Sequence, residues 1–179
     1  MGPEEGREFL QERIASFARL VFAISAGFFV AGSLLTAAAR LRPLVRGFPA
    51  DPSSLFQLAP CLVFLVMALA TRRAGLPIAV LRTIDAAGTI LGCWLVLLMA
   101  VNLPIPLRRD LMAVPPLLAT LLYRAAIVPS GMTRTISISA AAVAPVPLAT
   151  YAVYPREPSG VAPAAVFAIN AGWNLLLRD

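Results

Sequence analysis

The sequence contains no histidine and no lysine, because all 15 of its basic residues are arginine. Histidine is the side chain most used for proton transfer near neutral pH and the commonest metal ligand. Lysine is required for Schiff-base chemistry and for the phosphate-binding P-loop. The two cysteines, Cys61 and Cys93, lack C-x-x-C spacing and read as small apolar residues of the interior. We therefore expect no catalytic residues, no cofactor and no metal site.

Charge is scarce as well. Only 13% of the residues are charged and 59% are hydrophobic, and the mean hydropathy is +0.82. Soluble domains run near 45–50% apolar and about 25% charged residues. A chain of 179 residues with this balance cannot cover a water-exposed surface with polar groups. The composition therefore predicts an integral membrane protein whose apolar side chains face lipid.

The apolar residues fall into long runs that charged residues delimit. A bilayer core about 30 Å thick requires about 20 apolar residues in a helix, and these runs are continuous rather than alternating, which favours helices over a barrel. We predict one all-α membrane domain over 1–179, a compact bundle with short loops. Its six spans are 17–39, 54–71, 84–103, 111–128, 135–154 and 160–177. Five spans remain the alternative, because the fourth run is short and contains prolines and the sixth ends almost at the last residue of the sequence.

Residues 3–16 predict a further, amphipathic helix that leads into the first span. Phe9, Ile14 and Phe17 follow helical spacing and form an apolar stripe. One interpretation is a helix lying on the membrane surface. The other, which we favour, is a solvated extension of the first span, because anionic lipid repels an acidic segment.

The loop arginines indicate the orientation of the chain. More of them lie on the inner side when the N-terminus is placed in the cytoplasm, as the positive-inside rule requires. Six spans return the C-terminus to the same side. The arginines are spread over loops on both sides of the membrane and form no basic patch, so we expect no nucleic-acid partner.

Asp85 and Arg124 are the charged residues predicted nearest to membrane depth, and ionisable groups there are candidates for function. A structural interpretation is also open. Asp85 would follow Thr83 as a helix N-cap and pair with Arg82 in the first turn of a helix. Arg124 would extend its side chain to the membrane surface.

Three further sets of residues stand out within the spans. Asn170 and Asn174 lie one turn apart and are predicted to hydrogen-bond across the bundle. Pro145 and Pro147 are predicted to kink the fifth span by freeing the carbonyls of Ala141 and Val143. Small residues at helical spacing predict close helix packing, within the chain or in a homodimer seam. They are Ala23, Gly27 and Ala31 in the first span and Gly88 and Gly92 in the third.

Three short motifs stand at the helix ends and connections. They are F-L-Q-E-R-I-A-S-F-A-R at 9–19, L-R-T-I-D-A-A-G-T at 81–89 and Y-R-A-A-I-V-P-S-G-M-T-R-T at 123–135. Together they resemble the N-terminal membrane region of bacterial membrane-anchored serine/threonine protein kinases, in which about six helices precede a cytoplasmic kinase domain. The resemblance implies a sensor or anchor module in the bacterial inner membrane, with both termini in the cytoplasm.

The kinase signatures themselves need the lysine of V-A-I-K and the histidine of H-R-D, which this sequence lacks. The resemblance therefore predicts no enzyme within the chain, and any catalytic domain would lie outside it. Two alternatives remain: a small transporter or channel with Asp85, Asn170, Asn174 and the proline kink lining a path, or a membrane scaffold. The expected partners are the lipid bilayer, a second copy of the chain or another membrane protein.

Overall fold

A computed structural model of the chain describes residues 3–38, 52–73, 75–102 and 109–153. All regular secondary structure in these ranges is helical, which confirms the all-α class predicted from the sequence. The helices are α1 (Pro3–Ala38), α2 (Pro52–Ala70), α3 (Ile78–Asn102), α4 (Arg109–Ile127), α5 (Met132–Val143) and α6 (Val146–Val153).

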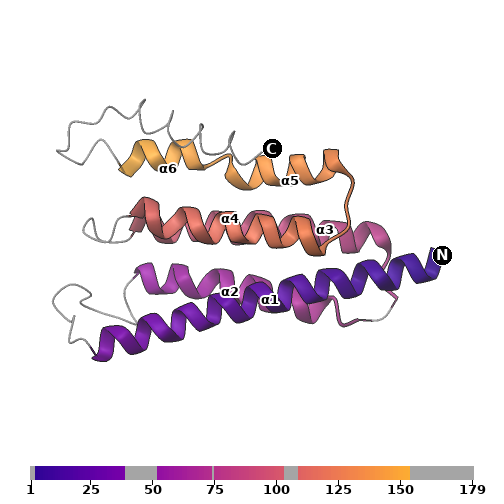
Figure 1. The fold of residues 1–179 in the computed structure, drawn as a ribbon, viewed down its shortest axis with the longest axis horizontal. Coiled ribbons are helices and arrows are strands. Elements are labelled where there is room, and N and C mark those ends of the chain that lie inside the picture. The colour runs from indigo at the N-terminus through magenta and orange to yellow at the C-terminus, as the bar shows by residue number, and fades with distance from the viewer. Residues whose placement is uncertain (1–2, 39–51, 74, 103–108, 154–179) are drawn as a thin grey trace.

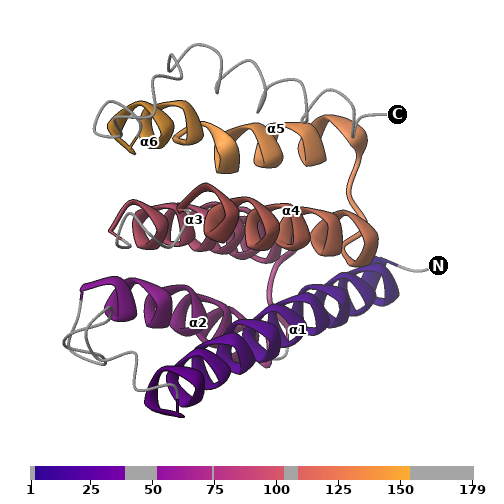
Figure 2. The same ribbon diagram turned by 60° about the vertical axis from the view of Figure 1, so that its left-hand side comes forward.

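The helices stack in three layers with their axes close to one direction (Figure 1). The first layer contains α1 and α2, the second α3 and α4, and the third α5 and α6, as a second view also shows (Figure 2). Helix α3 contacts every other helix in the described part of the chain. It is therefore the element against which the rest of the bundle is positioned.

Helix α1 is a single helix of 36 residues that includes both the lead-in segment and the first predicted span. Within the lead-in, Ile14 is completely buried, as are Phe17 and Ala18 just after it. These residues pack against α2, and the Phe17 ring meets that of Phe64 edge to face at 5.9 Å between centroids. Residues 3–16 and the first predicted span thus form one continuous helix, and the placement of residues 3–16 relative to a membrane stays a prediction.

The turn between α2 and α3 is tied to α1 by one side chain. Nε2 of Gln11 donates hydrogen bonds to the carbonyls of Thr71 (2.7 Å) and Arg73 (2.9 Å). These carbonyls follow the last residues of α2, where a helix leaves its acceptors without intrahelical donors. Gly75 then takes a φ of +77°, which only glycine adopts without strain, and reverses the chain into α3.

The other helix bounds lie within two residues of the expected spans except in two places. Helix α3 begins at Ile78, six residues before the predicted start at 84. The predicted span 135–154 is divided into α5 and α6 at Ala144 and Pro145. The predicted span 160–177 lies outside the described residues.

Two apolar clusters hold the layers together. The first joins α1, α2, the start of α3 and the residue that follows α4, and the second joins α3 to α4 and α5. The first contains Ile14, Phe17, Ala18, Val21, Phe64, Met67, Ala68, Leu81 and Val128. The second contains Cys93, Leu97, Ala100, Ala113, Leu117 and Ala142. The buried stripes of α3 and α4 thus face each other along most of their length.

Within the described residues, two helices are long and apolar enough to cross a membrane. They are the Glu4–Ala31 part of α1 and the whole of α3, whereas Leu58–Ala70 and Ala113–Ile127 are shorter apolar helices. Large apolar side chains point outward on several helices, among them Phe28 at 70% exposure and Leu148 at 74%. A multi-pass bundle of six spans remains a prediction.

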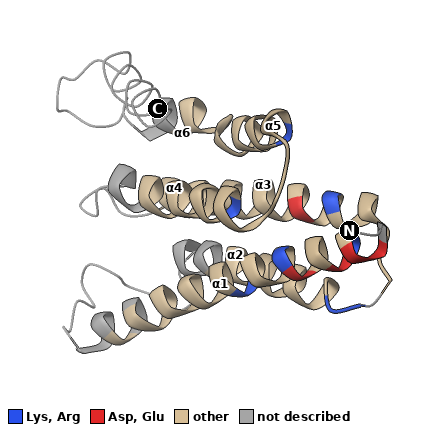
Figure 3. Ribbon diagram, turned by 45° about the vertical axis from the view of Figure 1, so that its right-hand side comes forward, with Lys and Arg blue, Asp and Glu red and all other residues tan. Residues whose placement is uncertain are grey.

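The charged residues coloured in Figure 3 lie at one end of the bundle. This end holds the start of α1, the α2–α3 turn and the α4–α5 connection, and arginines outnumber acidic residues there. The apolar lengths of the helices extend away from it. Among the residues coloured there, a charged end is therefore separate from an apolar body.

Candidate functional site: a buried aspartate–arginine cluster

Asp85 and Arg124 form a buried ion pair between α3 and α4. The carboxylate of Asp85 accepts hydrogen bonds from Nε of Arg124 at Oδ1 (3.0 Å) and from Nη2 at Oδ2 (2.6 Å). The two side chains are only 2% and 1% exposed. Paired, charge-assisted hydrogen bonds of this kind are the strongest that protein side chains form, so this contact fixes both the spacing and the register of the two helices.

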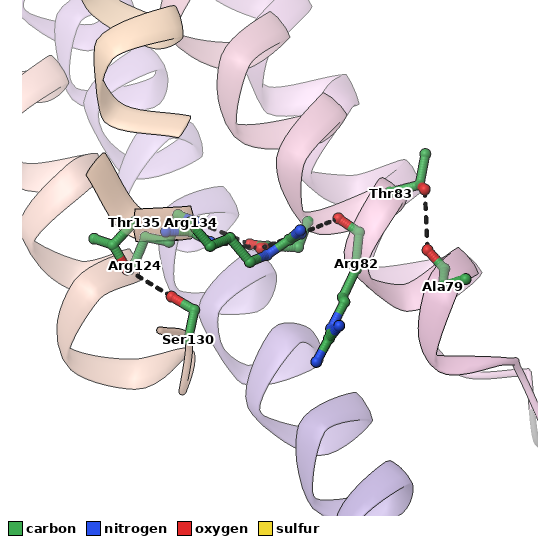
Figure 4. Close-up of polar contacts among 8 residues, drawn as sticks. Ala79, Arg82, Thr83, Arg124, Ser130, Arg134 and Thr135 are labelled. Carbon is green, nitrogen blue, oxygen red and sulfur yellow. Dashed lines mark hydrogen bonds and ion pairs between the residues drawn. The ribbon is translucent and has the colours of Figure 1, made fainter. Parts of the chain in front are cut away.

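Arg134 adds α5 to the same cluster. Its Nη2 lies 3.4 Å from Oδ2 of Asp85 and also donates a hydrogen bond to the carbonyl of Arg82 (Figure 4). The side chain of Arg134 is 32% exposed, so it closes the cluster on its outer side. One carboxylate thus links three helices, and two arginines share it.

The expected environment of Asp85 was wrong in three respects. Thr83 is no N-cap, because α3 begins at Ile78 and the Thr83 hydroxyl donates to the carbonyl of Ala79 instead (Figure 4). Arg82 contributes its carbonyl to Arg134 rather than its guanidinium to Asp85. Arg124 does not extend to the protein surface, because its side chain is buried and donates its hydrogen bonds to the buried carboxylate of Asp85.

These differences arise from the tertiary packing of α4 against α3. With two turns of α3 ahead of it, Asp85 lies on the buried stripe that faces α4, and a buried carboxylate needs donors from whichever helix packs against it. Arg124 meets that need because α4 runs antiparallel to α3. Sequence spacing alone favours near neighbours such as Arg82 and gives no sign of a partner 39 residues away.

Two polar atoms near the cluster have no hydrogen-bond partner in the described structure. They are Nη1 of Arg124 and the hydroxyl of Thr89, which lies one turn beyond Asp85 on the same buried stripe. The ion pair leaves Nη1 free because Nε and Nη2 contact the carboxylate. The cluster therefore carries hydrogen-bonding capacity beyond what its own residues use.

The predicted proline kink is present as a break between α5 and α6. A side chain that the sequence analysis did not single out replaces the hydrogen-bond donor that is lost there. Pro145 has no N–H, so the carbonyl of Ala141 loses its helical donor. The indole Nε1 of Trp94 donates to this carbonyl at 3.0 Å. Because Trp94 belongs to α3, helix α5 is attached to α3 near both of its ends, through Arg134 and through Ala141.

The two sets of small residues have different surroundings. Gly88 and Gly92 pack on α2, where an added Cβ would lie 2.7 Å from Sδ of Met67 and 2.6 Å from the Phe64 ring, respectively. Ala23, Gly27 and Ala31 are exposed on α1. The third-span glycines thus serve packing within the chain, whereas the first-span residues face outward.

The remaining candidates give no further site. Asn170 and Asn174 lie outside the described residues. Cys61 and Cys93 are buried free cysteines within the bundle. The described residues contain no group of three or more His, Cys, Asp and Glu residues that could hold a metal ion.

Asp85, Arg124 and Arg134 thus form an ion cluster that joins α3, α4 and α5 at the charged end of the bundle. Comparison of the chain with models of protein families, with curated proteins and with solved structures finds no match.

Proposed function

We propose that the chain is a multi-pass integral membrane module of the anchor or sensor type, without chemistry of its own. The observation that carries the proposal is the separation of a charged end from helices whose apolar side chains face outward. In water such a surface would bind other apolar surfaces, whereas in a bilayer it is solvated by lipid. The length and hydropathy of α1 and α3 agree with this location.

The charged end belongs in the cytoplasm under this proposal. Arginines outnumber acidic residues there, and cytoplasmic loops carry the excess of arginine in membrane proteins. The N-terminus, the α2–α3 turn and the α4–α5 connection then share one side of the membrane. This orientation is also the one that the resemblance to kinase membrane regions implies.

The anchor or sensor role rests on how the helices are joined. Hydrophobic force does not hold helices together in lipid, so packing and polar contacts must do so. The Asp85 carboxylate joins α3, α4 and α5, and the Trp94 contact holds α5 at the break before α6. A change in helix arrangement, or dimerisation, would therefore be communicated to the cytoplasmic end through few contacts.

Membrane extraction tests the location directly. We expect the chain to stay in the membrane fraction after alkaline carbonate treatment and to be released by detergent. Release by carbonate alone would contradict the proposal. A kinase encoded in the same or an adjacent reading frame would support the sensor role over a scaffold, and a flux phenotype of Asp85→Asn with unchanged expression would favour transport.

A further inference from the structure

Two hydrogen-bond donors in the interface between α3 and α4 are left unused by the ion cluster. Nη1 of Arg124 and the hydroxyl of Thr89 are shielded from solvent and have no partner within the described structure. The two residues are 1% and 0% exposed, respectively. A buried donor without an acceptor keeps its full cost of desolvation, which is larger for a charged group. In native proteins such groups are accordingly satisfied by an enclosed water or ion.

The two donors lie at neighbouring levels of this interface. The carboxylate of Asp85 holds Arg124 through Nε and Nη2, so Nη1 is the one nitrogen of the guanidinium that does not face the carboxylate. Thr89 follows Asp85 by one helical turn on the buried stripe of α3, which places their Cβ atoms about 5–6 Å apart. A single small ligand between these two levels is therefore within reach of both donors.

The charge and the donor set of this place favour an anion over a water molecule. Two guanidiniums, those of Arg124 and Arg134, share the single carboxylate of Asp85. Nη1 carries N–H groups and has no acceptor capacity. A bridging water would bring two hydrogens that need acceptors, yet none of the unpartnered buried side-chain atoms among the described residues is a carboxylate or amide oxygen. An anion only accepts hydrogen bonds, so it matches what the site offers.

The enclosure of the two atoms limits the size of the anion. Solvent reaches neither atom, and phosphate or a carboxylate has several oxygens that need donors, whereas a halide is spherical and accepts from any direction. We propose that Nη1 of Arg124 and the hydroxyl of Thr89 bind one chloride ion between α3 and α4. Because the cluster fixes the register of these helices, the ion ties the stability of the bundle to the chloride concentration. This inference goes beyond the proposed function and does not require the membrane location.

Thermal unfolding of the full chain, purified in detergent, tests this site. Sodium gluconate is replaced stepwise by sodium chloride at constant ionic strength. Chloride at about ten times its dissociation constant should raise the unfolding midpoint by about 3–6 °C, and the rise should saturate as the single site fills. A midpoint that is the same in both salts, or that changes in proportion to chloride without saturation, would overturn the proposal.

Equilibrium dialysis against radioactive chloride measures binding without unfolding the protein. We expect each chain to retain one chloride ion, with a dissociation constant that agrees with the one from the unfolding midpoints. Bromide should displace it, because a second halide competes for the same donors, whereas gluconate should not. Chloride that bromide does not displace, or none retained at protein concentrations above that dissociation constant, would contradict the site.

Variants of two threonines locate the ion. Thr89→Val should weaken chloride binding at least about tenfold, as the loss of one hydrogen bond to a charged ligand implies, and Thr89→Ser, which keeps the hydroxyl, should retain the response. Thr120→Val is the matched control, because Thr120 lies one turn from Arg124 on α4 and its hydroxyl donates to the carbonyl of Pro116. A Thr89→Val chain that keeps the chloride response, or is destabilised equally in both salts as loss of a bound water predicts, would overturn the proposal. Helicity by circular dichroism shows whether each variant has folded.

Discussion

At the scale of single residues, Asp85 and Arg124 make each other's burial possible. An isolated charge in a protein interior is expensive, and the carboxylate with its two arginines offsets that cost through hydrogen bonds at both oxygens. The cluster also makes the stability of three helices depend on one side chain. Its contribution is best measured by removing its members one at a time and together.

Asp85→Asn should destabilise the bundle by about 3–5 kcal/mol, because it leaves Arg124 buried without a counter-charge. Unfolding of the purified protein in mixed detergent with rising denaturant measures this loss. The double variant Asp85→Leu, Arg124→Met removes both charges and should recover much of it. A stable, well-expressed Asp85→Asn protein would mean that the ion pair is not structural.

Trp94→Phe should destabilise the bundle by about 1 kcal/mol, since it leaves the Ala141 carbonyl without a donor. Pro145→Ala restores a backbone N–H that can donate to the same carbonyl. In the Pro145→Ala background we therefore expect Trp94→Phe to have a clearly smaller effect, and a double-mutant cycle measures the difference. Equal effects in both backgrounds would show that Trp94 acts through packing alone.

Residue-scale prediction from the sequence succeeded where the cause is local and failed where it is tertiary. The scarcity of charge singled out Asp85 and Arg124, and the missing N–H of proline located the break before α6. The residues that contact them from other helices could not be predicted from the sequence. Arg134, Trp94 and Gln11 each act on a segment far away in the chain, at 49, 47 and 60 residues' separation.

At the scale of helices, the contact between α2 and α3 depends on glycine. A Cβ at Gly92 would overlap the buried Phe64 ring, and one at Gly88 would meet the flexible end of Met67. The pattern of small residues predicted close packing but could not say which helix would pack there. The two sets of small residues also differ in exposure, which spacing does not reveal.

Gly92→Ala should destabilise the protein by about 1–3 kcal/mol through overpacking, and Gly88→Ala by less, because Met67 can move. Gly27→Ala is the control, since no atom lies within 4 Å of its added Cβ. It should be neutral or slightly stabilising. Thermal unfolding in one detergent compares the three variants, and an unaffected Gly92→Ala protein would contradict the packing of α3 on α2.

At the scale of the whole molecule, the distribution of charge gives an orientation that can be measured. Arg73→Cys places a thiol in the exposed α2–α3 turn. We expect a membrane-impermeant thiol reagent to label it in inverted membrane vesicles and not in intact cells. The unaltered chain serves as the control, because Cys61 and Cys93 are buried. Labelling from the cell exterior would reverse the orientation.

The length of α1 also places its charged residues at different distances from the surface of a bilayer. Its 36 residues extend about 54 Å, and the apolar core of a bilayer takes up about 30 Å. Glu4 then stands about 24 Å beyond Leu20, more than two Debye lengths at physiological salt, whereas Arg19 lies within one. The anionic lipid surface would thus attract the lower arginines while the acidic tip is electrostatically screened from it, so an acidic N-terminus is compatible with an anionic membrane.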